Sequence, residues 1–293
     1  MTRFQELLRT DFAGRPTEDI DDVVLDAFDD PRYRERVPGI IELMNDPAAP
    51  ESERFLACLA LTTWAEPQGY EAVLRAAADP KNAPWYDVLI DRKFSVDSTF
   101  AQLATAAAER DMVTEKGTSE QRVEVLRALI RLADREYFED ELGEIIDDDT
   151  LRLLLGDVRD VVEHGVRFIA DGGKQSFDLT TQLVDLAAGA ARVDVPLAVD
   201  LALRVLSVSS SPRALRHAVT LIHRAPGPEG QRFAEYVMSV GDEDVRGLVR
   251  EALARTAPAK PSTRGGDGAP APVTAWHTGP LPGVRHPSLC RPT

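Results

Sequence analysis

The clearest hydrophobic pattern in the chain runs from Thr118 to Asp149. Its first half places apolar residues three or four positions apart, the spacing that aligns them on one face of a helix. These residues are Val123, Leu126, Ile130 and Ala133. Thr118, with Gln121 three positions later, predicts a capping box at the start of this helix.

A second helix is predicted after Asp134, where the apolar pattern restarts and acidic residues occupy the opposite face. Its apolar residues are Phe138, Leu142, Ile145 and Ile146. One helical hairpin cannot bury two such broad apolar faces by itself. The unit must therefore stack on similar units.

A short motif of the first helix recurs along the chain, as an arginine followed three, six and seven positions later by small or apolar residues. It begins at Arg54, Arg122, Arg159 and Arg246, with a poorer copy at Arg213. Arg122 and Arg159 are 37 positions apart, close to the length of a two-helix repeat. The interval from Arg213 to Arg246 is also near this period, whereas the interval from Arg159 to Arg213 does not fit it.

The last copy reads Val-Arg-x-x-Val-x-x-Ala-Leu over Val245–Leu253, preceded by Asp242 and Asp244. In this motif and its weaker relatives, over about residues 30 to 256 with gaps, the chain resembles the HEAT-repeat family, including the HEAT-like group of bacterial proteins. The resemblance implies an all-α fold, an α-solenoid of stacked antiparallel helix pairs whose concave face binds a ligand. The alternative is that the same amphipathic helices pack as an ordinary bundle.

Two segments follow from this pattern. Residues 1–256 are predicted to form the HEAT-like helical repeat domain, with an irregular insertion at about 81–117. Residues 257–293 contain eight prolines and five glycines in 37 positions and no apolar period. Because such a composition cannot bury a core, a disordered tail is predicted there.

Charge is unevenly distributed along the chain. The formal net charge is −15, and residues 257–293 contribute +3, which leaves −18 on residues 1–256. An acidic body repels nucleic-acid phosphate and anionic membrane surfaces, so we expect neither as a partner. It favours another protein that is basic, or serves solubility alone.

The sequence also indicates the compartment. The first residues lack the apolar core of a signal peptide, and no run approaches the roughly 18 apolar residues of a membrane span. Cys58 and Cys290 show no paired spacing that would indicate a disulfide framework. We therefore expect a cytoplasmic protein.

Motifs for catalysis and metal binding are missing from the sequence. The five histidines form no metal-ligand pair at one-turn spacing. The acidic run at 17–30 resembles a calcium loop in charge but lacks its central glycine and its final glutamate. Gly173-Lys174 lacks the other residues of a phosphate loop. We expect no catalytic residue, no metal and no cofactor.

The irregular insertion supplies the candidate binding site, because aromatic residues alternate there with charges of both signs. The candidate residues are Trp85, Tyr86, Asp87, Asp91, Arg92 and Asp97. Exposed aromatic residues among charges are typical of the centre of a protein interface. The alternative is that Trp85 and Phe94 fill the core where the repeat is imperfect, with Asp91 and Arg92 as a solvated pair.

The expected function is a non-catalytic protein–protein interaction module or scaffold that neutralises a basic partner, as an immunity protein does. The alternative is a HEAT-like enzyme acting on nucleic acid or a small ligand. A nucleic-acid enzyme would need a basic groove, for which the candidates are the four motif arginines, Arg54, Arg122, Arg159 and Arg246. We expect those arginines to pair with acids of adjacent repeats instead.

Overall fold

The computed structural model describes residues 2–91, 96–138 and 141–256. The predicted tail, 257–293, lies outside the described residues. The α-helices are α1 (Arg3–Leu8), α2 (Asp21–Val24), α3 (Tyr33–Asn45), α4 (Glu51–Thr63), α5 (Pro67–Ala78), α6 (Thr99–Ala108), α7 (Val113–Lys116), α8 (Ser119–Ile130), α9 (Leu142–Ile145), α10 (Asp148–Ala170), α11 (Leu179–Ala190), α12 (Val195–Val208), α13 (Pro212–Arg224), α14 (Pro228–Val240) and α15 (Glu243–Thr256). Two 3-10 turns, η1 (Asp26–Phe28) and η2 (Pro80–Asn82), accompany them. The predicted all-α class is confirmed.

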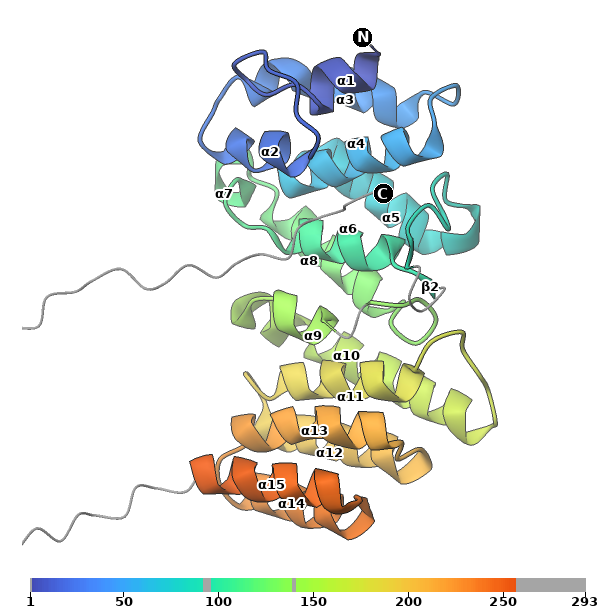
Figure 1. The fold of residues 1–293 in the computed structure, drawn as a ribbon, viewed down its shortest axis with the longest axis vertical. Coiled ribbons are helices and arrows are strands. Elements are labelled where there is room, and N and C mark those ends of the chain that lie inside the picture. The colour runs from blue at the N-terminus through green and yellow to red at the C-terminus, as the bar shows by residue number, and fades with distance from the viewer. Residues whose placement is uncertain (1, 92–95, 139–140, 257–293) are drawn as a thin grey trace, which may run out of the picture.

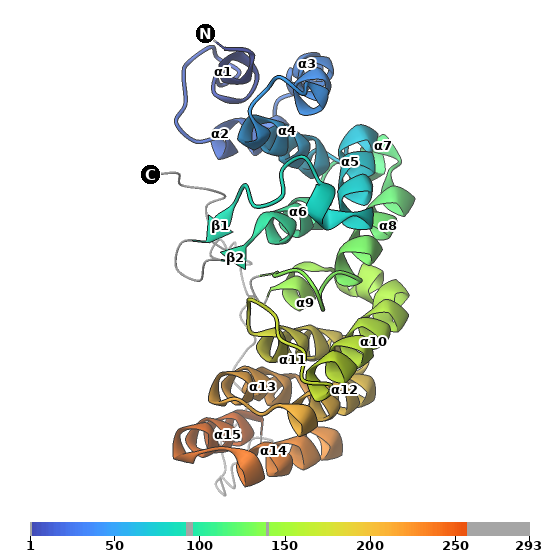
Figure 2. The ribbon, with the colours of Figure 1, turned by 90° about the vertical axis from the view of Figure 1, so that its right-hand side faces the viewer.

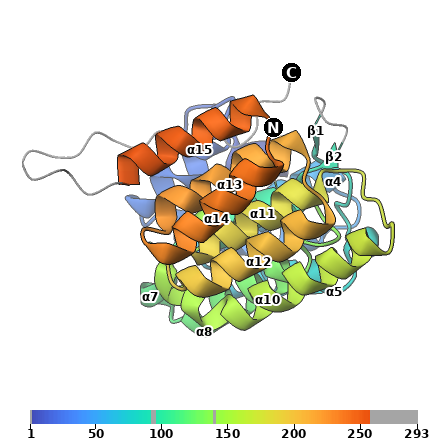
Figure 3. The same cartoon turned by 90° about the horizontal axis from the view of Figure 1, so that it is seen from below.

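The helices form two rows that run the length of the molecule (Figure 1 and Figure 2). In one row α4, α6, α9, α11, α13 and α15 pack each against the next, and in the other α5, α8, α10, α12 and α14 do so. Helices α1 and α3 cover the N-terminal end through α4. Figure 3 looks along the stack from its C-terminal end, where α14 and α15 are nearest the viewer. One continuous cluster of buried apolar side chains runs through both rows from Phe4 to Ala252.

Inside the predicted insertion, helix α6 packs between α4 and α9 in the first row. Before it lie η2, a loop, and a hairpin in which β1 (Ile90–Asp91) pairs antiparallel with β2 (Val96–Asp97). This departure from the stack positions the candidate site described below.

The capping box predicted at Thr118 is wrong. The Thr118 hydroxyl is buried and donates to the carbonyl of Ala65, which lies beyond the end of α4, and it makes no cap hydrogen bond to α8. The Thr118 hydroxyl therefore bonds to a residue of another segment, and the capping box within α8 does not form. Other helices are capped locally, since Asp147 and Asp178 each accept from the backbone N–H three positions later.

The second helix of the 118–149 unit is also shorter than predicted. Between Asp134 and the start of α10, only Leu142–Ile145 is helical among the described residues, although Phe138 is buried as expected. The reason is the buried Gln182 side chain of α11, which accepts from the Phe138 N–H at 2.7 Å. It also donates to the carbonyls of Ala133 and Glu136, at 2.6 and 2.9 Å. The turn is thus held against α11, and its backbone groups are not available to extend a helix.

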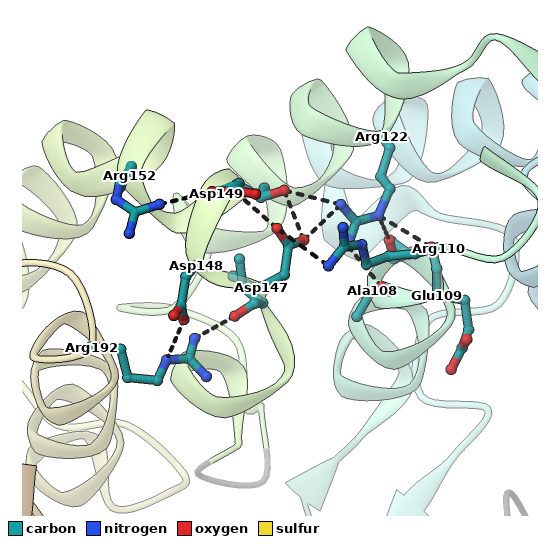
Figure 4. Close-up of polar contacts among 12 residues, drawn as sticks. Ala108, Glu109, Arg110, Arg122, Asp147, Asp148, Asp149, Arg152 and Arg192 are labelled. Atoms are coloured by element: carbon teal, nitrogen blue, oxygen red, sulfur yellow. Dashed lines mark hydrogen bonds and ion pairs between the residues drawn. The ribbon is translucent and has the colours of Figure 1, made fainter. Parts of the chain in front are cut away.

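Arg122 connects three helices at one buried junction (Figure 4). Its side chain is 5% exposed, and it donates to the carbonyls of Ala107, Ala108 and Glu109, at the end of α6. It also donates to Asp147 Oδ2 and Thr150 Oγ1 at the start of α10, both at 3.0 Å.

The prediction for the motif arginines therefore needs a correction. Arg122 does pair with an acid of another helix, Asp147, but Arg54 and Arg246 donate from Nε to the carbonyls of Met44 and Met238, at the ends of α3 and α14. The acid near Arg246 is Glu243 of its own helix, at 3.9 Å. Arg159 is exposed on α10. The physical reason is that the last carbonyls of a helix have no intrahelical donor, so a nearby guanidinium satisfies them.

Among the described residues, no helix combines the length and the apolar character needed to cross a bilayer.

Candidate binding site

An open cavity of about 660 Å³ lies where the irregular stretch interrupts the stack. Its walls come from the end of α5 and η2, the loop before β1, strand β2, the turn after α8, and the loop between α10 and α11. In Figure 2 the yellow loop between α10 and α11 faces the β1–β2 hairpin across this region. The lining residues are Ala78, Asp79, Pro80, Lys81, Tyr86, Asp87, Val96, Asp97, Arg135, Glu136, Tyr137, Gln175, Ser176 and Phe177.

Three aromatic side chains form part of the wall. The rings of Tyr137 and Phe177 lie 5.6 Å apart between centroids and are tilted by 43°. Tyr86 is half-buried, and its hydroxyl lies 3.5 Å from Glu136 Oε2. Aromatic faces of this kind attract cations through their quadrupole.

Carboxylates also line the cavity, together with basic and uncharged polar side chains. Asp97 is half-buried and accepts from the backbone N–H groups of Thr99, at 3.1 Å, and Asp87, at 3.3 Å. Glu136 is 9% exposed. Among the described residues, no basic group lies within 4.0 Å of the carboxylates of Asp87, Asp97 or Glu136. The two basic residues of the lining, Lys81 and Arg135, are exposed.

Burial makes ionisation of these groups unfavourable. It raises the pKa of Glu136 to about 6, and the neighbouring Asp97 charge adds to the shift, while Tyr86, Lys81 and Arg135 oppose it. Burial also raises the pKa of Asp97 against the hydrogen bonds that it accepts. The pKa of Tyr86 is raised to about 12, first by burial and then by Glu136. A cation in the cavity would reverse this effect.

Asp87 has a left-handed backbone conformation, with φ at 63°, which residues other than glycine rarely adopt. Its N–H donates to Asp97 Oδ2, and its own side chain is exposed at the cavity. This conformation places Asp87 beside Asp97 although ten positions separate them.

The cavity includes three of the six predicted site residues, Tyr86, Asp87 and Asp97. Trp85 is not an exposed anchor. It is 3% exposed and its ring packs edge-on against Phe55, with 6.5 Å between centroids. For Trp85 the structure agrees with the alternative, in which this ring fills the core. Burying so large an apolar ring is favourable even for a residue that lies in a loop. The Asp91 side chain, and the whole of Arg92 and Phe94, lie outside what the structure describes.

Glu136, Tyr137 and Phe177 were not predicted as site residues. A signal existed for the first two, because Arg135-Glu136-Tyr137 interrupts the apolar period of the 118–149 unit with charged and aromatic residues. No local signal connects Phe177 with them, since it reaches the cavity from a loop 40 positions further along the chain.

Metal binding and thiol chemistry receive no support from the described part of the chain. No group of three or more histidine, cysteine, aspartate or glutamate side chains within residues 2–91, 96–138 and 141–256 could hold a metal ion. Cys58 is buried, and burial raises the pKa of its thiol to about 12, which keeps it protonated.

In comparisons with known proteins, the chain matches no family model, no curated protein and no solved structure. The candidate function therefore depends on the geometry and charge of the cavity.

Proposed function

We propose that this protein is a cytoplasmic, non-catalytic interaction module, a HEAT-like α-solenoid that binds a basic protein by taking one of its cationic side chains into the cavity. The observation that carries the proposal is the set of carboxylates on Asp87, Asp97 and Glu136. They line an aromatic-walled cavity in which no basic group of the described residues lies within 4.0 Å of them, and its two basic lining residues, Lys81 and Arg135, are exposed.

The energetic argument is that these acids are unfavourably placed in the free protein. Removing a carboxylate from water costs free energy unless an opposite charge or hydrogen bonds compensate. The raised pKa values of Asp97 and Glu136 reflect this cost. A lysine or arginine side chain of a partner would compensate it, and contact with an aromatic face adds about 0.5–2 kcal/mol.

The charge of the whole body supports the same partner class. Residues 1–256 carry a net charge of −18, which accelerates encounter with a cationic protein at low salt. Screening by salt reduces that attraction because the Debye length falls to about 8 Å at physiological ionic strength. Neutralisation of a cationic toxin or nucleic-acid enzyme is the specific role that we propose for such a surface.

The test is a binding experiment with the full-length chain immobilised, native lysate as the source of partners, and washes at low and then high salt. We expect one basic protein to be retained at low salt and weakened at high salt. The double variant Asp87→Asn, Asp97→Asn should lose it.

The matched control combines Asp244→Asn with Glu235→Gln, which also removes two negative charges, from exposed positions on α15 and α14 far along the chain from the cavity. If the wild type, the double variant and the control retained the basic protein equally, the cavity would not be its binding site. Retention that is insensitive to salt would argue against electrostatic recognition.

A second candidate, an enzyme acting on a small ligand, is favoured by one observation. The pKa of Glu136 is raised to about 6 beside the Tyr86 hydroxyl, and perturbed acids in cavities are common in acid–base catalysis. A thermal-shift screen of metabolites separates the candidates. A small molecule that stabilises the wild type and is turned over, but is not turned over by Glu136→Gln, would favour the enzyme.

A further inference from the structure

A second pocket, of about 320 Å³, lies beside the loop that walls the acidic cavity. It is formed by the end of α3, the first turn of α4, the last turn of α5 and the loop after η2. Asp79 lines both hollows, whereas Tyr86 lines only the acidic cavity and Trp85 only this pocket. Its polar lining consists of Asn45, Arg54, Arg75, Asp79, Asn82 and Trp85.

The two arginines of this pocket have little compensation for their charge. Arg54 donates from Nε to the Met44 carbonyl at 3.2 Å, and no carboxylate among the described residues lies within 4.0 Å of its guanidinium. The nearest carboxylate to Arg75 is Glu71, at the limiting distance of 4.0 Å. By contrast, Arg122 and Arg224 hold carboxylates at 3.0 and 2.5 Å.

The remaining polar groups are mostly hydrogen-bond donors. Asn45 and Asn82 each donate one amide N–H within the protein, to Ile41 O and Asp79 Oδ2, and each amide has a second N–H. The indole N–H of Trp85 is buried and has no hydrogen-bond partner in the described part of the chain. An unpaired buried donor is costly and calls for a partner.

We infer that this pocket binds an oxyanion, a phosphate or carboxylate group, between Arg54 and Arg75. Guanidinium groups bind both anions with paired N–H donors, and charge-assisted hydrogen bonds of this kind are the strong ones. The volume lies at the lower end of the range of about 300–1,000 Å³ for ligand pockets, which suits a small ligand. Asp79 opposes binding, because it is the carboxylate among the described lining residues.

This inference is independent of the proposed function, since the charge preference is opposite and the ligand groups differ. The loop that carries Trp85 and Tyr86 would then lie between a cavity that prefers cations and a pocket that prefers anions. Binding of an anion beside Arg75 is expected to change the fluorescence of Trp85, whose ring lines the pocket.

The experiment uses the full-length chain and titrates it with sodium phosphate or sodium acetate at constant ionic strength, followed by tryptophan fluorescence and calorimetry. Saturable binding of at least one of the two anions is expected. Arg75→Gln should weaken it at least tenfold, and Asp79→Asn should strengthen it several-fold. Arg75 suits this test because it is 64% exposed and its loss leaves the helix ends intact, whereas Arg54 also holds a helix carbonyl.

The matched control is Arg152→Gln, which removes an arginine of similar exposure from α10, where it pairs with Asp149. Its affinity for the anion should equal that of the wild type. Saturation by phosphate alone would identify a phosphate ligand, saturation by acetate alone would identify a carboxylate, and saturation by both would identify a site that accepts either group. Absence of saturable binding by either anion, or equal affinities of the Arg75→Gln and Arg152→Gln variants, would overturn the inference.

Discussion

Two carboxylates eleven positions apart, Asp147 and Glu136, stand in regions of opposite character. At the junction of α6, α8 and α10, burial alone would raise the pKa of Asp147, but hydrogen bonds from Thr150 and Arg122 lower it to about 2. In the cavity, burial raises the pKa of Glu136 to about 6, and no basic side chain in the described region pairs with it closely. Asp147 is thus compensated within the chain, whereas Glu136 has no close basic partner in the described region, and our proposal assigns that role to a cation of the bound protein.

The largest expected effect comes from breaking the compensated region. Arg122→Met removes the guanidinium from the Asp147 carboxylate and from the carbonyls at the end of α6, and leaves Asp147 with hydrogen bonds from Thr150 but without its close cation. Loss of one member of a buried ion pair costs about 3–5 kcal/mol. Urea unfolding should register a loss of this size.

The control for this variant is Arg152→Met, which breaks an exposed pair with Asp149. Exposed pairs contribute about 0–1 kcal/mol, so this change should be small. Similar losses of unfolding free energy in the two variants would mean that the buried ion pair contributes no more than an exposed one.

A smaller loss is expected where the cavity is attached to the stack. Gln182→Met removes three hydrogen bonds to the turn that carries Glu136 and leaves buried backbone groups unpaired. This should cost about 2–4 kcal/mol and weaken binding of the basic partner, because the turn loses its fixed position. Denaturant unfolding and the binding assay measure the two effects.

Gln102→Met provides the matched comparison on α6. Its Oε1 is buried without a hydrogen-bond partner in the described part of the chain. Replacement by an apolar side chain of similar shape should change the free energy of unfolding by less than about 1 kcal/mol, in either direction. A loss as large as that of Gln182→Met would show that volume, not hydrogen bonding, sets the cost.

The pH dependence of stability should separate the two acids. The pKa of Glu136 is raised from 4.5 to about 6 on folding, so the folded state binds this proton more tightly than the unfolded chain. Its contribution to stability is present below pH 4.5 and is lost as pH rises through about 6, by about 1–2 kcal/mol. Glu136→Gln should therefore be more stable than the wild type at pH 7.5 and similar to it at pH 5.

Asp147 should behave in the opposite way. Because its folded pKa is lowered from 3.8 to about 2, its contribution is present above pH 3.8 and is lost as pH falls toward 2. Asp147→Asn should destabilise the protein at pH 7.5. A Glu136→Gln variant whose stability relative to wild type did not vary with pH would contradict the assignment of unpaired acids to the cavity.

The smallest effect on stability is expected at the exposed rim. Asp87→Asn should change the free energy of unfolding by no more than about 0.5 kcal/mol, because the Asp87 side chain is exposed. The same substitution should weaken binding of the basic partner several-fold. A large loss of stability would indicate that the Asp87 carboxylate, and not only its backbone, holds the loop.

Part of the candidate site could be predicted from local sequence. Tyr86, Asp87 and Asp97 stand out because charged and aromatic residues replace the apolar period there. The same reasoning selected Trp85, which packs on Phe55 instead, because composition does not indicate the direction in which a loop side chain points. Phe177 had no local signal at all, since it joins the cavity through the folding of a distant segment.

The sequence by itself determined the helices and their class, because an apolar residue every three or four positions and a local cap such as Asp178 act within one turn of the chain. Tertiary structure alone decided which polar groups are compensated. The Thr118 hydroxyl donates to the Ala65 carbonyl and does not cap its own helix. The Gln182 side chain bonds to the backbone of the turn before α9, and Arg122 donates to Asp147. These outcomes depend on the distances between segments far apart in the chain, and no local pattern of residues encodes those distances.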